Sequence, residues 1–363
     1  MSKHKQVVVS FCDGISCGQI ALKKLGITDY IYHAFETDKY ASAVAKYNNK
    51  SMFQHGDVRN YLGVYDKYLY ARKVDLFLSG FPCQPFSVAG KRLGTQDERD
   101  LSTIVFDAMK LLRPEYFLIE NVPMKKTDQD RISKELGVEP IIINSADFSA
   151  QNRKRLYWTN IPVSKWTDKG IVLNDIVEEG FVDRNKSHCL DANYHKGGNL
   201  KSYFNKHRRQ LVFSNMETSK CKQVGVADLK GHDILKRVYC TSGKAPTVNA
   251  MTGGNREPKI VCGSIKKDNV LVDNEKMYWR ALTPLECERL QTIPDGYTSK
   301  GDFSITSIYS DIKDVSNHQR YKQIGNGWTV DVIAHILKGI KNECNPRIHW
   351  EDSNRWNKKE WRE

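Results

Sequence analysis

A single cysteine stands between two prolines in the stretch SGFPCQPFS, which covers residues 79–87. Cys83 follows an apolar run, residues 74–79, that the pattern predicts to be a buried strand. A nucleophilic thiol must be accessible and partly ionised, and a loop at the end of a strand gives it access. The flanking prolines restrict the backbone, so that the sulfur is held in position before a substrate arrives. This stretch therefore predicts a catalytic cysteine, with Gln84 beside it in the same turn.

A carboxylate and two arginines are predicted to lie near this thiol. Glu120 stands at the end of another apolar run, EYFLIENV, and parallel strands bring their carboxyl ends to the same edge of a sheet. There a carboxyl group can give a proton or a hydrogen bond to a substrate nitrogen. In QNRKRLYW, the alternation of Gln151, Arg153 and Arg155 places all three side chains on one face if the segment is a strand. Two arginines on one face suit a carbonyl oxygen and a phosphate, and a salt-bridged sheet surface is the alternative.

A glycine-containing turn follows the first apolar run, QVVVSF. The turn, residues 13–18, lies between a predicted strand and a predicted helix, an arrangement that lets a ligand approach the backbone closely. Glu36 and Asp57 follow the next two predicted strands. Carboxylates at the ends of successive parallel strands face one crevice, and an acid after the second strand is well placed to accept hydrogen bonds from ribose hydroxyls. The alternative role for each carboxylate is the N-cap of a helix.

The elements that must position these residues alternate along the first half of the chain. Near-continuous apolar runs are separated by stretches with helical spacing, which predicts parallel strands inside an α/β sandwich. Later in the chain, Thr283 and Pro284 predict the start of a helix, with the threonine as its N-cap. A last helix is predicted from apolar residues that share one face, namely Val330, Ile333, Ile336, Leu337 and Ile340.

The regular pattern breaks down between these parts of the chain. Residues 184–259 contain 15 Lys and Arg against 5 Asp and Glu, and so carry +10 of the formal net charge of +13. A charge excess confined to one segment favours a polyanionic partner, above all nucleic acid, over an evenly basic surface. The predicted regions are a first catalytic part (1–163), a basic, irregular and β-rich module (164–277), a second catalytic part (278–345) and a charged tail (346–363).

The pattern of cysteines and the lack of long apolar stretches argue against a disulfide-rich, zinc-binding or membrane protein. The chain has 363 residues and nine cysteines without CxxC pairs, which favours reduced thiols in a cytosol-like compartment over a disulfide framework. The Cys and His spacings fit no zinc signature, so no metal is expected. No stretch has the apolar length of a signal peptide or a membrane span, so no membrane partner is expected.

Five motifs occur in the order and spacing of a known family. PCQPFS, ENV, QNRKR, RALTPLECERLQ and QIGNG resemble the motifs of the C5-cytosine-specific DNA methyltransferase family, and the likeness extends from about Val7 to Lys341. The basic segment lies where that family carries its target-recognition region. The stretches FCDGISCG, ENVPMKK and GNGWTVDVIAHIL also resemble the de novo (type 3) animal branch. The resemblance implies a mostly parallel, Rossmann-like S-adenosylmethionine-dependent methyltransferase sandwich with a smaller, irregular β-rich target-recognition module.

The resemblance further implies a DNA (cytosine-5)-methyltransferase that works by covalent catalysis. Cys83 would add to C6 of cytosine, Glu120 would bond N3, and Arg153, supported by Arg155, would hold O2 and the catalytic loop. C5 would take the methyl group of S-adenosyl-L-methionine, with S-adenosyl-L-homocysteine as the product, and a base would then remove the C5 proton. The target base cannot be reached inside duplex DNA and must flip out.

Binding residues carry over from the family to named positions. Glu36 would bind the ribose of the cofactor and Asp57 its adenine amine, while Asn326 and Trp328 would close the pocket. The predicted cofactor-binding residues are Phe11, Cys12, Asp13, Gly14, Ile15, Gly18, Glu36, Thr37, Asp57, Val58, Gly80, Pro82, Asn326 and Trp328. The predicted DNA-binding residues are Ser87, Lys91, Arg92, Arg208, Arg209, Lys236 and Arg237.

Two positions depart from the family pattern. Members usually carry an adenine-stacking aromatic residue where this chain has Cys12, and Phe11 is expected to point the other way. Many bacterial members have Gly-Asn-Ser or Gly-Asn-Ala where this chain has GNGW, so Trp328 is expected to fill the space differently. Neither departure affects the residues that would carry the chemistry.

Other functions fit fewer of these residues. A tRNA cytosine-5 methyltransferase shares the catalytic motifs but typically carries a Cys-Phe-Thr element, which this sequence lacks. A catalytically silent nucleic-acid-binding homologue is a second alternative, and the retained Cys83, Glu120 and Arg153 argue against it. A nicotinamide dehydrogenase would need the GxGxxG spacing, which the turn lacks.

The expected partner is double-stranded DNA, and the expected role is restriction-modification or a related form of DNA methylation. The expected location is the cytoplasm of a bacterium or of a virus's host, or the nucleus if the source is eukaryotic. The recognition sequence and the oligomeric state stay open.

Overall fold

The computed structural model describes residues 5–70, 72–82, 100–196, 198, 200–206, 208–214, 223–226, 237–239, 259–260, 278–304 and 310–341. The described residues form two compact units. The first unit lies within Met1–Val172, Lys186–Lys196 and Thr283–Glu363, and the second lies within Leu173–Asn185 and Gly197–Leu282. Six residues with predicted roles lie outside the described residues, namely Cys83, Gln84, Ser87, Lys91, Arg92 and Lys236.

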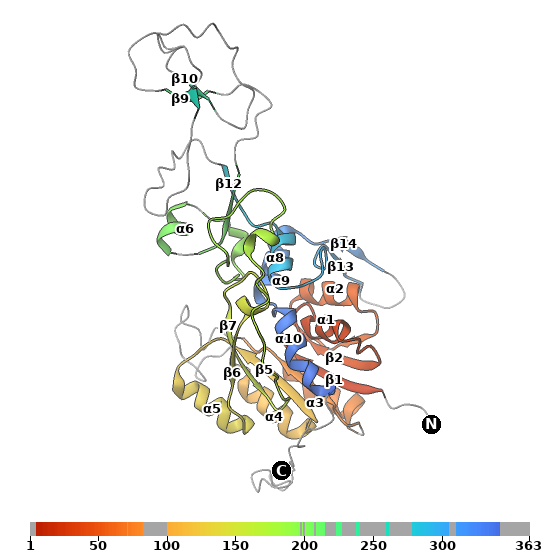
Figure 1. The fold of residues 1–363 in the computed structure, drawn as a ribbon. Helices are drawn as coiled ribbons and strands as arrows, with labels where there is room; N and C mark the ends of the chain where they lie inside the picture. The colour runs from red at the N-terminus through yellow and green to blue at the C-terminus, as the bar shows by residue number, and fades with distance from the viewer. Residues whose placement is uncertain are drawn as a thin grey trace, which may run out of the picture. The chain divides into compact units, whose positions relative to one another are not determined.

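A seven-stranded sheet forms the centre of the first unit, with the strand order β3-β2-β1-β4-β5-β7-β6 (Figure 1). Strands β1 to β5 pair in parallel, which confirms the predicted, mostly parallel α/β sheet. Strand β7 departs from the predicted parallel pairing, because it runs antiparallel to both β5 and β6. The link between β6 and β7, residues 145–153, is too short for a crossover helix, so the two strands pair as antiparallel neighbours. The strands are β1 (Gln6–Phe11), β2 (Tyr30–Phe35), β3 (Met52–Gln54), β4 (Leu76–Ser79), β5 (Tyr116–Asn121), β6 (Ile141–Asn144) and β7 (Lys154–Thr159).

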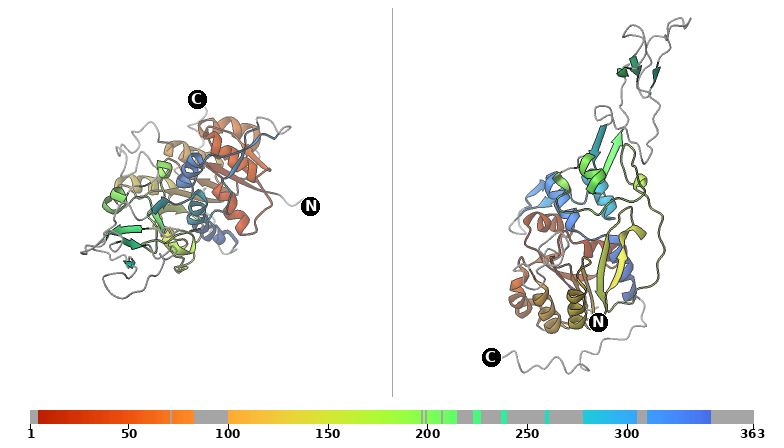
Figure 2. Two further views of the ribbon diagram at one scale, coloured as in Figure 1. Left: turned by 90° about the horizontal axis from the view of Figure 1, so that it is seen from above. Right: turned by 90° about the vertical axis from the view of Figure 1, so that its left-hand side faces the viewer.

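Helices cover both faces of this sheet (Figures 1 and 2). Helices α3, α4 and α5 pack on one face, and α1 and α10 pack together on the other. Within the described part of the chain, no helix combines the length and the apolar character that a membrane crossing requires. The helices of the first unit are α1 (Cys17–Lys24), α2 (Lys39–Asn48), α3 (Tyr61–Val64), α4 (Ser102–Leu112), α5 (Lys126–Leu136), α8 (Pro284–Leu290), α9 (Asn317–Asn326) and α10 (Val330–Leu337). A small two-stranded sheet, β13 (Lys300–Asp302) and β14 (Ile312–Asp314), completes the unit.

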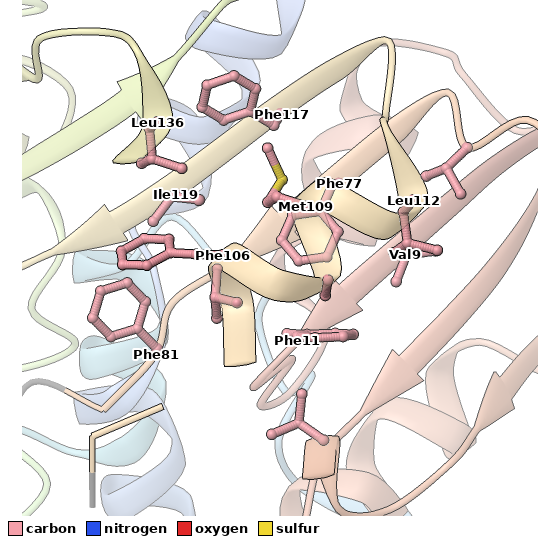
Figure 3. Packing of buried hydrophobic residues seen from close by; sticks show 14 of the residues in the cluster. Val9, Phe11, Phe77, Phe81, Phe106, Met109, Leu112, Phe117, Ile119 and Leu136 are labelled. Atoms are coloured by element: carbon pink, nitrogen blue, oxygen red, sulfur yellow. The ribbon is translucent and has the colours of Figure 1, made fainter. Parts of the chain in front are cut away.

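Large apolar side chains fill the space between the sheet and α4 (Figure 3). Val9, Phe77 and Phe117 from three strands meet Phe106 and Met109 from α4, and none of the five is more than 4% exposed. Truncating a buried side chain of this size to alanine typically costs about 2–5 kcal/mol. The packing fixes β1, β4 and β5 side by side, so the segments that follow these strands emerge at one edge of the sheet.

Helix α1 lies close against the opposite face at Gly18. A Cβ atom at this position would lie 2.6 Å from Leu78 Cδ1 and 3.0 Å from Tyr32 Oη, so the close approach requires glycine. Beside α1, helix α10 buries the apolar face that the sequence predicts, which comprises Val330, Ile333, Ile336 and Leu337. The fifth predicted member, Ile340, is half-buried in the short 3-10 helix that follows.

Helix α8 begins where the sequence predicts. The Thr283 hydroxyl accepts a hydrogen bond from the Glu286 backbone N–H, and the Glu286 carboxylate accepts one from the Thr283 backbone N–H. With Pro284 in the first turn, this capping box satisfies backbone donors that a helix start leaves without partners.

The described part of the second unit contains two small sheets and one α-helix. A three-stranded sheet has the order β11-β10-β9, and β12 pairs with β8. Tyr203, Leu211 and Phe213 form a buried cluster in this unit. Its elements are α6 (Leu200–Lys206), β8 (Leu211–Ser214), β9 (Gln223–Val226), β10 (Arg237–Tyr239), β11 (Lys259–Ile260) and β12 (Tyr278–Ala281).

Candidate active site

A cavity of about 410 Å³ opens at the carboxyl ends of β1, β2, β4 and β5. Thirteen of the residues predicted from the sequence line it, namely Cys12, Gly14, Ile15, Glu36, Thr37, Asp57, Val58, Gly80, Pro82, Glu120, Arg153, Arg155 and Asn326. Eleven lining residues were not predicted, namely Phe35, Asp38, Ala41, Gly56, Arg59, Phe81, Leu101, Val122, Lys322, Gln323 and Gly325. Four predicted cofactor residues do not line it, namely Phe11, Asp13, Gly18 and Trp328. The predicted nucleophile, Cys83, directly follows the lining residue Pro82 in the chain.

The turn after β1 is tied to the end of β2. Gly14 adopts a left-handed conformation with φ of +57°, which favours glycine. Its backbone N–H donates to Glu36 Oε2 at 2.8 Å, and the Asp38 N–H donates to Glu36 Oε1 at 2.7 Å. Burial raises the pKa of Glu36, and these two hydrogen bonds oppose the shift. The carboxylate is therefore held in one orientation at the cavity wall.

Asp13 serves the turn itself and does not line the cavity. Its carboxylate accepts hydrogen bonds from the Ser16 hydroxyl and, at 2.6 Å, from the Tyr32 hydroxyl. Burial raises the pKa of Asp13 to about 6, although hydrogen bonds from nearby hydroxyls act in the opposite direction. The Asp13 side chain therefore stabilises the turn, and its contact with a cofactor stays a prediction.

Asp57 is a helix N-cap, one of the two roles that the sequence offers as alternatives, and its role toward a cofactor stays a prediction. It caps the short helix Val58–Asn60 by accepting a hydrogen bond from the Arg59 backbone N–H at 2.9 Å, and it also lines the cavity. Hydrogen bonds from the Arg59 backbone and side chain lower the pKa of Asp57, so the carboxylate stays ionised at neutral pH.

Glu120 and Arg155 form an ion pair at the cavity wall. Arg155 Nε lies 2.9 Å from Glu120 Oε1, and the two side chains are 13% and 11% exposed. Burial acts to lower the pKa of Arg155, but the neighbouring Cys189 and Glu120 outweigh it and raise that pKa. The other carboxylate oxygen, Glu120 Oε2, accepts a hydrogen bond from Trp328 Nε1 at 3.1 Å. Trp328, predicted as a cofactor residue, thus contacts the predicted catalytic carboxylate.

Arg153 is directed mainly at backbone carbonyls. It is 4% exposed and donates to Leu190 O at 3.1 Å, Gly325 O at 3.3 Å and Gly327 O at 3.0 Å. The strand that the alternation predicts begins only at Lys154, so Gln151 does not share the face of the two arginines. Instead, Gln151 is buried and accepts the Leu190 N–H at 2.9 Å. Arg155, and not Arg153, is the guanidinium that pairs with Glu120.

A model of the C-5 cytosine-specific DNA methylase family matches residues 7–342 of the chain. The chain belongs to this family. The match covers the turn after β1, the ion pair at the end of β5 and the helices that close the first unit. The prediction from the five motifs is thereby confirmed.

Curated relatives in the C-5 cytosine-specific DNA methylase family come from phages and bacteria. The orphan methyltransferase M.SPBetaI of Bacillus phage SPbeta is 26% identical, and the comparison covers 94% of this chain and 98% of the relative. The type II methyltransferase M.HhaI of Haemophilus parahaemolyticus is also 26% identical, with 94% and 98% covered. The likeness to the de novo branch stays a prediction.

Solved structures with the same fold include two eukaryotic proteins. The Entamoeba histolytica methyltransferase EhMeth superposes with a TM-score of 0.58 at 14% identity, covering 95% of this chain and 100% of that one. A Spodoptera frugiperda DNMT2 variant gives a TM-score of 0.56 at 18% identity, with 92% and 99% covered. These similarities support the methyltransferase fold predicted from the sequence.

C-5 cytosine-specific DNA methylases usually carry a stacking aromatic residue where this chain has Cys12. Here that position is open to the cavity. Cys12 lines the cavity, and burial together with the nearby Glu36, Asp57 and Asp13 raises the pKa of its thiol. Phe11 is 1% exposed and packs edge-on against Phe35 and Phe77, so it points away as expected. The Phe11 side chain therefore belongs to the core, and its place among the cofactor-binding residues stays a prediction.

Three of the predicted DNA-binding residues are described by the structure, and all three lie in the second unit. Arg208 is exposed, Arg209 is half-buried with φ of 55°, and Arg237 belongs to β10. Among the residues that the structure describes, no three His, Cys, Asp or Glu side chains are grouped so that they could hold a metal ion.

Sequence reasoning did not assign a role to two residues at or near the site. Gln291 is the last residue of the RALTPLECERLQ motif, and it donates to Gly327 O at 3.0 Å and Ile324 O at 2.9 Å. Lys322 pairs with Asp38 at 2.6 Å, next to the QIGNG motif. Position at the end of a motif for Gln291, and beside a motif for Lys322, was the only available signal, since both residues act through contacts with distant parts of the chain.

Proposed function

We propose that this family member methylates C5 of cytosine in double-stranded DNA, with Cys83 as the nucleophile and S-adenosyl-L-methionine as the methyl donor. The observation that carries the proposal is the Glu120–Arg155 ion pair, which shares the cavity wall with Pro82. Cys83 follows Pro82 directly, so a short distance along the chain separates the predicted nucleophile from a paired carboxylate and guanidinium. Such a set suits addition of a thiolate to a ring that is held at a nitrogen and at a carbonyl oxygen.

The residues around the glycine turn suit S-adenosyl-L-methionine. Glu36 is oriented by two backbone N–H groups and keeps lone pairs for ribose hydroxyls. Asp57 is an ionised acceptor suited to an adenine amine, while Cys12 and Val58 offer less polar surface beside it. The cavity volume of about 410 Å³ falls within the usual range for small-molecule sites. When bound, S-adenosyl-L-methionine supplies an electrophilic methyl group for C5 of cytosine.

The protein's own side chains carry out the covalent addition, the proton transfer and the binding of the base. The Cys83 thiolate forms a bond to C6, while Glu120 in its protonated form passes its proton to N3, where electron density builds up, and takes it back when the S–C6 bond breaks. Arg155 is placed to bind O2, because it already pairs with Glu120 at the cavity wall. Arg153, which also lines the cavity, keeps the Gly325–Gly327 backbone in position and so supports the wall. Loss of the C5 proton then lets the S–C6 bond break and returns Cys83 as the thiolate.

The basic segment, residues 184–259, is proposed to contact DNA. Its excess of Lys and Arg suits the phosphate backbone, and the exposed Arg208 is one candidate contact. The phage and bacterial relatives support DNA as the substrate and the bacterial cytoplasm as the place of action, with a role in DNA modification. The likeness to DNMT2 concerns the fold and does not favour tRNA.

Transfer of a labelled methyl group tests the proposal. Protein, unmethylated plasmid DNA and tritiated S-adenosyl-L-methionine are incubated, and the DNA is digested to nucleosides. We expect the label in 5-methyldeoxycytidine, with none after the Cys83→Ser substitution. Label in adenine, or label in tRNA but not in DNA, would contradict the proposal.

A further inference from the structure

We infer that Trp328 is a positioning residue for Glu120, whose carboxylate it holds in the cavity wall together with Arg155. The inference rests on the proposed function, in which Glu120 acts at N3 of cytosine. Trp328 Nε1 donates to Glu120 Oε2 at 3.1 Å, and Arg155 Nε lies 2.9 Å from Glu120 Oε1. Each carboxylate oxygen therefore has one donor of a different kind, a neutral indole N–H and a charged guanidinium.

The indole ring lies between Glu120 and the end of β4. A Cβ atom at Gly80 would lie 2.7 Å from Trp328 Nε1 and 3.1 Å from both Cε2 and Cζ2, so the ring edge touches the backbone there. Gly80 is three residues before Cys83 in the chain. One side chain thus contacts the catalytic carboxylate and also the strand end from which the nucleophile's loop begins.

Buried hydrogen bonds fix the backbone on both sides of Trp328. Arg153 Nη2 and Gln291 Nε2 both donate to Gly327 O at 3.0 Å. On the other side, Thr329 Oγ1 donates to Gln291 Oε1 at 2.7 Å. Because Arg153, Gln291 and Thr329 are at most 4% exposed, this frame is shielded from water. The indole N–H is therefore aimed at Glu120 before any substrate binds.

The two donors suit different moments of the reaction. Arg155 can move its charge from Glu120 to O2 of the incoming cytosine, which frees Oε1 for N3. The indole is neutral and its frame is rigid, so it stays on Oε2 and keeps the carboxylate from rotating. Losing a hydrogen bond to a charged group, or displacing a catalytic group slightly, has a large effect on rate. Removal of the indole N–H should therefore lower kcat by about 10- to 100-fold.

A double-mutant cycle with a matched control tests this inference. Trp328→Phe keeps an aromatic ring but removes the N–H, and kcat should fall about 10- to 100-fold while KM for DNA and for S-adenosyl-L-methionine changes less than about threefold. In a Glu120→Gln background the same substitution should have little further effect. Trp166→Phe is the control, because Trp166 Nε1 makes a similar bond to Asp147 Oδ2 at 2.9 Å and does not line the cavity. It should leave kcat within about twofold of wild type.

Two kinetic outcomes would overturn the inference. The first is an equal loss of kcat from Trp328→Phe in both backgrounds, which would mean that Trp328 does not act through Glu120. The second is a loss that is confined to the KM for S-adenosyl-L-methionine, which would make Trp328 a cofactor residue.

The indole N–H resonance of Trp328 gives a readout that needs no turnover. In protein labelled with ¹⁵N-tryptophan, which has seven tryptophans, the signal that disappears in Trp328→Phe should shift in Glu120→Gln. The signal that disappears in Trp166→Phe should not shift. An unmoved Trp328 signal overturns the inference whatever the activity. A shifted signal in a wild-type protein that methylates no cytosine overturns the proposed function instead, so the two failures are distinguishable.

Discussion

Charged side chains around the cavity divide into those that reach it and those that stabilise its frame. Glu120 and Arg155 pair with each other at the wall. Asp13 turns toward Ser16 and Tyr32 and does not line the cavity, whereas Arg153 lines it and also donates to backbone carbonyls. The sequence could not separate these roles, because residue type and spacing are the same for an arginine that meets a substrate and one that holds a loop.

Asp13 predicts a pH dependence of stability at the residue scale. Burial raises its pKa from 3.8 to about 6, so between pH 4 and 6 the folded protein binds this proton and the unfolded chain does not. The contribution of Asp13 to the free energy of unfolding therefore falls as the pH rises through this window. From pH 4.5 to 7.5, wild type should lose about 2 kcal/mol relative to Asp13→Asn, which cannot ionise.

Urea unfolding of both proteins at the two pH values measures this difference. Asp29→Asn is the control, since the Asp29 side chain is 63% exposed, and it should follow wild type. The same change for wild type and Asp13→Asn between the two pH values would show that Asp13 titrates alike in both states.

At the scale of elements, the strands were predictable because burial on both faces leaves near-continuous apolar runs. The start of helix α8 was predictable from its N-cap, and most of the buried face of α10 was predictable from the spacing of its apolar residues. The direction of β7 was not predictable, because it depends on the length of the link between β6 and β7 and not on the residues within the strand. The segment 151–153 also read as strand, although it is a loop whose side chains serve distant backbone groups.

The contact of helix α1 with the sheet gives a prediction at this scale. Gly18→Ala would place a methyl group 2.6 Å from Leu78 Cδ1, so the helix or the side chain must shift. We expect a loss of about 1–3 kcal/mol in the free energy of unfolding. Gly63→Ala in α3 is the matched control, because nothing lies within 4 Å of its added Cβ, and it should be neutral or stabilising by up to about 1 kcal/mol. Equal stability of the two variants in urea unfolding would argue against a close approach at Gly18.

At the scale of the whole molecule, the candidate site is assembled from segments that are far apart in the chain. The turn after β1, the ends of β4 and β5, and α9 all line one cavity of the first unit, although about 300 residues separate the first from the last. Parallel strands made most of this assembly predictable, since their carboxyl ends meet at one edge. The contact between Trp328 and Glu120 was not predictable, because no local pattern records a hydrogen bond across that distance.

The covalent bond between Cys83 and cytosine is the central claim, and trapping it is the most direct test. Duplex DNA that contains 5-fluorodeoxycytidine has no C5 proton to release, so the enzyme should stay attached after methyl transfer. In the presence of S-adenosyl-L-methionine, we predict a denaturation-resistant complex whose digested peptide carries the nucleotide on Cys83, and no such complex with Cys83→Ser. Attachment at another residue, or no complex from a preparation that methylates ordinary cytosine, would contradict the account.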